Sequence, residues 1–184
     1  MPRMRLALAS GVLLLAVPAL ASCGFDYPTD RVNTVGAGVS DRDGTVDVVG
    51  ALIVAGQSDS GTLIGALASN DEENPISLVS ISGGDDGAVA ADAFEPIELS
   101  PLGHFNLATL AEEDEGITVS GDFDAGDFVD VTFTFDNDES VSVEIPVMKP
   151  CDQYEGLDNT QQGTSEAEPL YTCASDGAEA PAEH

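Results

Sequence analysis

Four residues near the N-terminus, Leu20-Ala21-Ser22-Cys23, have the most specific chemistry in the sequence. Small residues directly before a cysteine, with a leucine three positions ahead of it, are typical of a lipobox, the processing site of bacterial lipoproteins. On this interpretation the Cys23 sulfur receives a diacylglyceryl group through a thioether bond, and the chain is cut before Cys23. Two or more acyl chains then hold a protein stably on a membrane.

Residues 1–22 have the composition of a secretory signal peptide. Arg3 and Arg5 form a short positive region, and residues 6–20 are apolar. This stretch is shorter than the roughly 20 residues that cross a membrane as a helix. We therefore predict a signal peptide at 1–22, a lipidated tether at 23–31 and a location on the extracytoplasmic face of the cell membrane. Ordinary secretion with another cleavage site and a retained membrane helix are the alternatives.

Two more cysteines, Cys151 and Cys173, remain once Cys23 is assigned to lipid. Exported proteins meet an oxidising compartment in which disulfides form and persist. We therefore predict a Cys151–Cys173 disulfide, which would contribute on the order of 3 kcal/mol by restricting the unfolded chain. Two free thiols in a polar tail are the alternative.

Other residue types that support catalysis or metal binding are sparse. His104 is the only histidine of the predicted domain, and nucleophilic catalysis needs a base beside the nucleophile. Asp41, Asp43 and Asp47 resemble the opening of a calcium loop, but the later glutamate of that loop is missing. Acidic residues near 122–127 form a second acid-rich turn with the same interpretation. We predict no enzyme, no catalytic residue, no cofactor and no metal site.

The charge of the chain restricts its partners. The sequence has 5 basic and 34 acidic residues, for a formal net charge of −29. Removal of residues 1–22 takes away two basic residues and no acidic ones, which changes the net charge to −31. Nucleic-acid binding depends on Lys and Arg that meet phosphates, so we exclude it. Membrane lipid bound through Cys23 and a basic envelope protein are the predicted partners.

The elements that must position these residues follow a β pattern from residue 32 to residue 148. The clearest signal is a hairpin in which apolar residues alternate with polar ones on both sides of the turn at 136–139. Pro146 lacks an N–H, which indicates that its strand lies at an edge there or is ending. Candidate strands are 32–39, 45–54, 62–68, 76–81, 96–99 and 105–110, whereas residues 88–93 suggest at most a turn of helix.

The spacing of these strands favours a sandwich or a barrel built as one domain, at 32–148. Residues 149–184 form an acidic tail without periodicity. We expect that tail to be mobile except where the two cysteines tie it.

The final hairpin, residues 126–147, is similar to the last two strands of the periplasmic copper chaperone family called PCu(A)C. Residues 94–103 and 116–121 resemble the strand and turn and the strand that precede that hairpin in the family. The resemblance implies an all-β, antiparallel Greek-key sandwich of cupredoxin-like or immunoglobulin-like type. It also implies Cu(I) ligands of the His and Met type, which suit a soft ion. The segments that would supply them, 116–120 and 76–87, contain neither His nor Met.

These observations lead to two functional hypotheses. The first is a lipid-anchored extracytoplasmic lipoprotein whose β-sandwich is a non-catalytic binding or interaction domain. The alternative is a copper (metal) chaperone with a diverged ligand set, for example Met148, His184 or the reduced cysteines.

Overall fold

The computed structural model describes residues 36–84, 89–161 and 173. They belong to one compact unit, Gly36–His184. The predicted signal peptide, the lipobox Leu20-Ala21-Ser22-Cys23, the tether and His184 lie outside the described residues. Within the described ranges, no helix has the length and apolar character to span a membrane.

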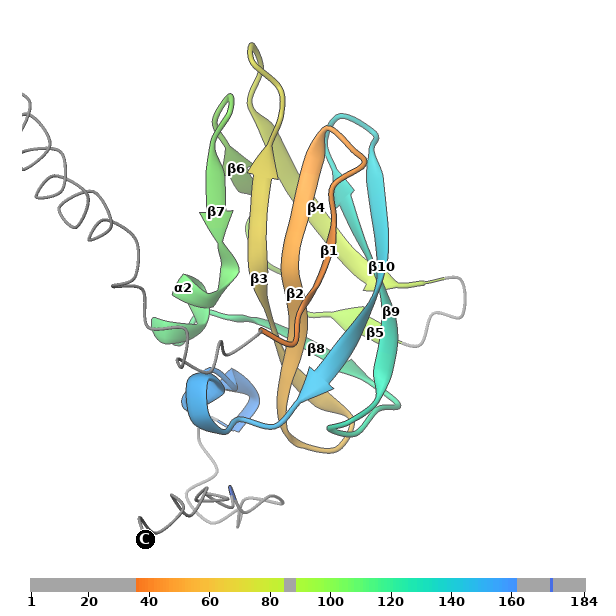
Figure 1. Cartoon of the computed structure of the whole chain (residues 1–184), viewed down its shortest axis with the longest axis vertical. Helices are drawn as coiled ribbons and strands as arrows, with labels where there is room; N and C mark the ends of the chain where they lie inside the picture. Colours follow the sequence, from red (N-terminus) through yellow and green to blue (C-terminus); the bar gives the residue numbers. More distant parts are fainter. Residues whose placement is uncertain (1–35, 85–88, 162–172, 174–184) are drawn as a thin grey trace, which may run out of the picture. The chain divides into compact units, whose positions relative to one another are not determined.

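Ten strands and three short helical segments make up the described part of the chain, so the predicted all-β class is confirmed (Figure 1). The strands are β1 (Val39–Asp41), β2 (Val46–Gln57), β3 (Ser60–Ser69), β4 (Ile76–Gly83), β5 (Val89–Ala91), β6 (Ile97–Leu99), β7 (His104–Asn106), β8 (Ile117–Gly121), β9 (Phe128–Phe135) and β10 (Ser140–Met148). The helical segments are α2 (Leu107–Glu112), η1 (Asp152–Tyr154) and η2 (Asn159–Gln161).

Seven of the strands form a closed, barrel-like circuit. Its order is β2-β10-β9-β4-β5-β8-β3, and β3 pairs with β2 again. The pairing of β10 with β2 is parallel, through Val147 with Ile53 and Met148 with Val54. The other pairs are antiparallel, so the prediction of an antiparallel sheet is wrong at this one seam.

The remaining strands share edges with strands of the circuit. The outer edge of β3 pairs with β8 over Ser60–Leu63 and with β7 over Ala66–Ala68. The outer edge of β4 pairs with β6 at Ile76–Leu78 and with β5 at Ser82. The pairing of β5 with β8 closes the circuit at one end. At the other end β6 and β7 each pair with one strand only, so the sheet is open between them.

Burial of one face in the core explains why apolar and polar residues alternate so clearly along the hairpin of β9 and β10. On β9 and β10 the residues of one face are buried and those of the other are exposed or half-exposed, in step with the period-2 pattern; Pro146, which is buried, is the exception. Phe133 and Phe135 are fully buried, and Val131 pairs with Val143 across the hairpin. The main cluster also includes residues from β2, β3 and β4, so one hydrophobic core unites the circuit.

The strand predicted at 32–39 is irregular over residues 36–38, and β1 begins at Val39. Two other predicted elements differ in type. Residues 88–93, predicted as a turn of helix at most, contain the strand β5, because β8 offers an edge for Val89–Ala91 to pair with. Residues 105–110, predicted as a strand, change from β7 into α2. The side chain of Asn106 accepts a hydrogen bond from the Ala108 N–H and begins the helix as an N-cap.

The prediction for Pro146 left two options open, an edge position or the end of the strand. Because its ladder with β2 has not yet begun, β10 is an edge strand at Pro146 and pairs there only with β9. It ends at Met148, and its ladder with β2 begins only at Val147, one residue after the proline. The missing N–H of Pro146 therefore removes no bond from the β2 seam.

Candidate metal centre

Three sulfur-bearing side chains belong to the segment that leaves β10. Met148 is the last residue of the strand, Cys151 follows it, and Cys173 is bonded to Cys151 with a Cα–Cα distance of 5.5 Å. The structure thus contains the disulfide predicted from the sequence. Cys151 N–H donates to the Lys149 carbonyl (2.8 Å), a tight turn that brings Cys151 back toward the strand end.

The segment after Cys151 is held on the domain by Asp158. Its carboxylate accepts hydrogen bonds from the Gly56 N–H at 2.7 Å and from the Thr160 N–H at 3.0 Å. Gly56 lies in β2, so this bond ties the tail segment to the end of the β2–β3 hairpin. The expected mobility of the tail is therefore wrong for Asp152–Gln161, which no periodic pattern marks but which side-chain hydrogen bonds fix in place.

Asn159 makes a second set of bonds beside Asp158. Its N–H donates to Thr62 Oγ1 (2.7 Å), its side-chain NH₂ donates to the Ala111 carbonyl (3.0 Å), and its Oδ1 accepts from the Gly116 N–H (2.8 Å). Thr62 is fully buried, so its hydroxyl needs such a partner. Asn159 therefore joins β3, the end of α2 and the start of β8 through one side chain and one N–H.

Met148 lies in a second, smaller apolar cluster. The buried members are Leu52, Val54, Ile64 and Ala111, and half-buried Met148, Tyr154 and Leu157 pack against them. The apolar contacts of Tyr154 and Leu157 keep the turn around η1 close to the strand end that bears Met148. The distance from Met148 to Cys151 along the chain is at most about 10 Å, because three residues span no more.

The other predicted ligand positions do not join this segment. His104 is exposed at the start of β7, where it pairs with Ala68. On β8, the strand that would bear the His-x-Met pair of the PCu(A)C family, Ile117 and Val119 are buried in the core. On β4 the buried residues Ile76, Leu78 and Ile81 face the same core.

In the two acid-rich turns the carboxylates accept hydrogen bonds from neighbouring N–H groups and from one side chain. Asp43 N–H donates to Asp41 Oδ1 (3.2 Å), and the side chain of Asn70 donates to Asp47 Oδ1 (2.8 Å). In the second turn Asp124 N–H donates to Asp127 Oδ2 (2.9 Å). Across the described residues, no group of three or more His, Cys, Asp and Glu side chains could hold a metal ion.

No protein family and no curated protein matches the chain. Solved structures that are similar to it include "Apo PCuAC domain from PmoF1", which is 15% identical with a TM-score of 0.48 and covers 61% of this chain and 100% of that one. "apo PmoF2 PCuAC domain" is 15% identical (TM-score 0.47), covering 62% of this chain and 98% of that one. "Copper-bound PCuAC domain from PmoF2" is 17% identical with a TM-score of 0.47, and the match covers 61% of this chain and 99% of that one.

The chain therefore resembles PCuAC domains, as the hairpin residues predicted. The same finding corrects the first functional hypothesis. A non-catalytic binding or interaction domain was the main interpretation of the sequence. The similar structures are PCuAC domains, one of them described as copper-bound, and this finding does not agree with that interpretation.

Proposed function

We propose that this protein carries Cu(I) outside the cytoplasm, with the ion held by Cys151, Cys173 and Met148. One observation supports this ligand set. Among the described residues, the sulfur-bearing side chains all belong to the segment that leaves β10 or are bonded to it, and the single histidine lies elsewhere, on β7. Thiolate and thioether sulfur are the donors that Cu(I) prefers.

The cysteines must be reduced before they can bind the ion. A dithiol protein of the envelope would attack the Cys151–Cys173 bond and become a disulfide itself, which transfers two electrons and two protons to this chain. Cu(I) would then displace the two thiol protons and bind both thiolates, with the Met148 sulfur as a neutral third donor. The negative charge of this chain favours a basic surface on that dithiol partner. This chemistry makes the protein a carrier rather than an enzyme.

The anchoring segment explains how this site would survive reduction. Asp158 and Asn159 fix residues after Cys151 to the domain without using the disulfide. Met148 is fixed by β10 and by the second apolar cluster. Two of the three donors therefore stay close to their positions when the bond between the cysteines opens.

The test is a Cu(I) competition titration of the full-length chain in detergent, in reduced and in oxidised form, against a chromogenic Cu(I) chelator. We expect the reduced form to remove one equivalent of Cu(I) and the oxidised form to remove none. Cys151→Ser/Cys173→Ser should abolish binding, and Met148→Leu should weaken it by about tenfold for the loss of one ligand. His104→Gln is the matched control and should bind like the parent. Equal binding by the oxidised form or by the double serine variant would refute the proposal.

We infer the location from the sequence alone. The lipobox supports lipidation of Cys23 and attachment to the extracytoplasmic face of the cell membrane. Cys23→Ser should release the protein from the membrane fraction, because the chain after residue 22 is strongly anionic and is repelled by anionic headgroups. Retention of the Cys23→Ser variant on the membrane would contradict this assignment. For the fold, the closed circuit supports a cupredoxin-like Greek-key arrangement.

A further inference from the structure

A pocket of about 540 Å³ opens where the sheet is not closed, between β6 on one side and β7, α2 and the start of β8 on the other. Its position follows from the topology. The outer edges of β3 and β4 join through β8 and β5 at one end, but at the other end β7 and β6 do not pair with each other. Pockets of this volume hold small organic ligands.

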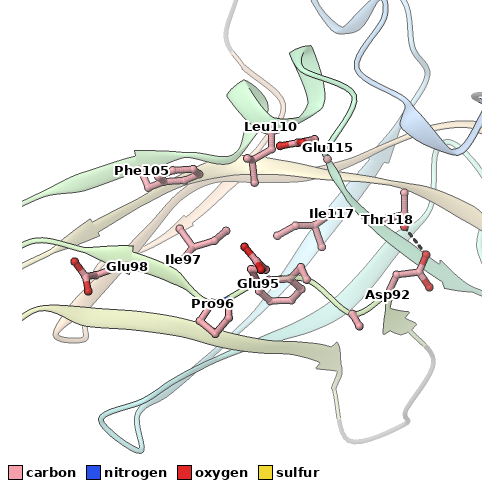
Figure 2. A pocket seen from close by; sticks show the side chains of 13 residues that line it. Asp92, Glu95, Pro96, Ile97, Glu98, Phe105, Leu110, Glu115, Ile117 and Thr118 are labelled. Carbon is pink, nitrogen blue, oxygen red and sulfur yellow. Dashed lines mark hydrogen bonds between the residues drawn. The ribbon is translucent and has the colours of Figure 1, made fainter.

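The pocket has an apolar interior. Ile97 and Ile117 are buried, and Phe94, Phe105 and Leu110 are half-buried, so that part of each of these three side chains is open to a ligand. Figure 2 shows Ile97, Ile117, Phe105 and Leu110 around the space between the two strands. An aromatic or branched hydrocarbon group placed there would remove from water both its own apolar surface and that of the pocket.

The rim of the pocket is anionic. Glu95, Glu98, Glu115 and Asp92 line it, and none of its lining residues is cationic. In Figure 2 the Glu95 carboxylate points into the middle of the pocket, and that of Glu115 extends toward Leu110. Asp92 accepts a hydrogen bond from the Thr118 hydroxyl (2.6 Å). The carboxylates of Glu95 and Glu115 are therefore the ones that best fit a cationic group of a ligand.

We propose that this pocket binds a small amphipathic amine, whose hydrocarbon body fills the apolar interior while its ammonium group lies between Glu95 and Glu115. Apolar contact alone would accept neutral molecules, and the carboxylates alone would attract any cation. The combination selects a molecule that has both parts. The faces of Phe94 and Phe105 add attraction for an ammonium group that approaches the ring. The site is separate from the proposed copper ligands and does not depend on them.

The test is calorimetric titration of the full-length chain in detergent, without metal, with 2-phenylethylammonium as the probe and 2-phenylethanol as its neutral counterpart. We expect the amine to bind, the alcohol to bind at least about tenfold more weakly, and added NaCl to weaken the amine only. Glu95→Gln/Glu115→Gln should reduce amine affinity by about tenfold, since each exposed ion pair contributes about threefold.

Glu72→Gln/Glu73→Gln is the matched control, because it makes the same charge change on the exposed loop between β3 and β4. It should leave amine affinity within about twofold of the parent. The proposal is overturned if the amine does not bind, if the alcohol binds equally well, or if both double variants weaken the amine to the same extent. Both variants change exposed residues, and unchanged thermal unfolding verifies that each is folded.

Discussion

Replacement of Asn159 by alanine tests whether the segment after β10 is fixed by side-chain hydrogen bonds. The change removes the bond that Oδ1 accepts from the Gly116 N–H and the bond that the side-chain NH₂ donates to the Ala111 carbonyl. The Gly116 N–H is half-buried and can regain water, so the loss of its bond costs about 1 kcal/mol. The buried Ala111 carbonyl keeps a longer bond from the Asp114 N–H (3.3 Å), so the loss of the Asn159 bond costs about 1 kcal/mol there too. The expected loss in the free energy of unfolding is about 2 kcal/mol.

Urea unfolding followed by far-ultraviolet circular dichroism measures this loss. With a slope of about 2 kcal/mol per molar, the midpoint should fall by about 1 M. Gln153→Ala, at an exposed position of η1 in the same segment, is the control and should change stability by less than about 0.5 kcal/mol. Asn159→Asp should be no more stable than Asn159→Ala, because its second oxygen would face the Ala111 carbonyl without a proton to donate. An Asn159→Ala variant as stable as the control would refute the role given to this side chain.

Three further predictions concern other parts of the domain. Gly116→Ala should lower the unfolding midpoint, because a Cβ there would overlap the Asn159 amide and lie 2.6 Å from Thr62 Cγ2; a midpoint equal to that of the parent would contradict this. Main-chain N–H groups of Asn74 and Glu73 bond the Asp71 carboxylate and lower its pKa below 3.8. Its contribution to stability is thus present above about pH 4 and lost as the pH falls further, and an NMR titration should find the lowered pKa. Reduction of the disulfide should cost up to about 3 kcal/mol, measured by urea unfolding with and without a dithiol reductant.

The hairpin of β9 and β10 could be predicted from the sequence because its signal is local. Apolar and polar residues alternate on both strands, and burial of one face requires that period. The class of the fold followed from this hairpin and from the spacing of the other strands. Closure of the sheet into a circuit could not be predicted from the sequence, because the parallel seam joins Val147 and Met148 to β2, which is distant in the sequence.

The two wrong assignments of secondary structure, at 88–93 and at 105–110, have different causes. The Ala-rich residues 89–91 have no β pattern of their own and become a strand because they pair with β8 and with β4. Residues 105–110 were predicted as a strand, but Asn106 caps a helix that begins at Leu107. A Ser, Thr, Asp or Asn before an apolar stretch is a signal that could have identified this helix start.

Of the candidate sites, the cysteine pair could be predicted and the pocket could not. Cys151 and Cys173 are identifiable by residue type and compartment. The carboxylates of Glu95 and Glu115 come from two separate connections, which only the folded topology brings to one opening. In a chain with 34 acidic residues, composition does not distinguish these two from the rest. Asp158 and Asn159 were missed for a similar reason, since their partners lie on β2, β3, α2 and β8.

The parallel seam between β2 and β10 affects how the molecule reaches its native state. One partner is formed near the beginning of the domain and the other near its end, so the circuit cannot close before β10 has been synthesised. Native pairings between distant segments also form slowly. A growing chain that has not reached β10 therefore leaves the β2 side of this seam without its native partner.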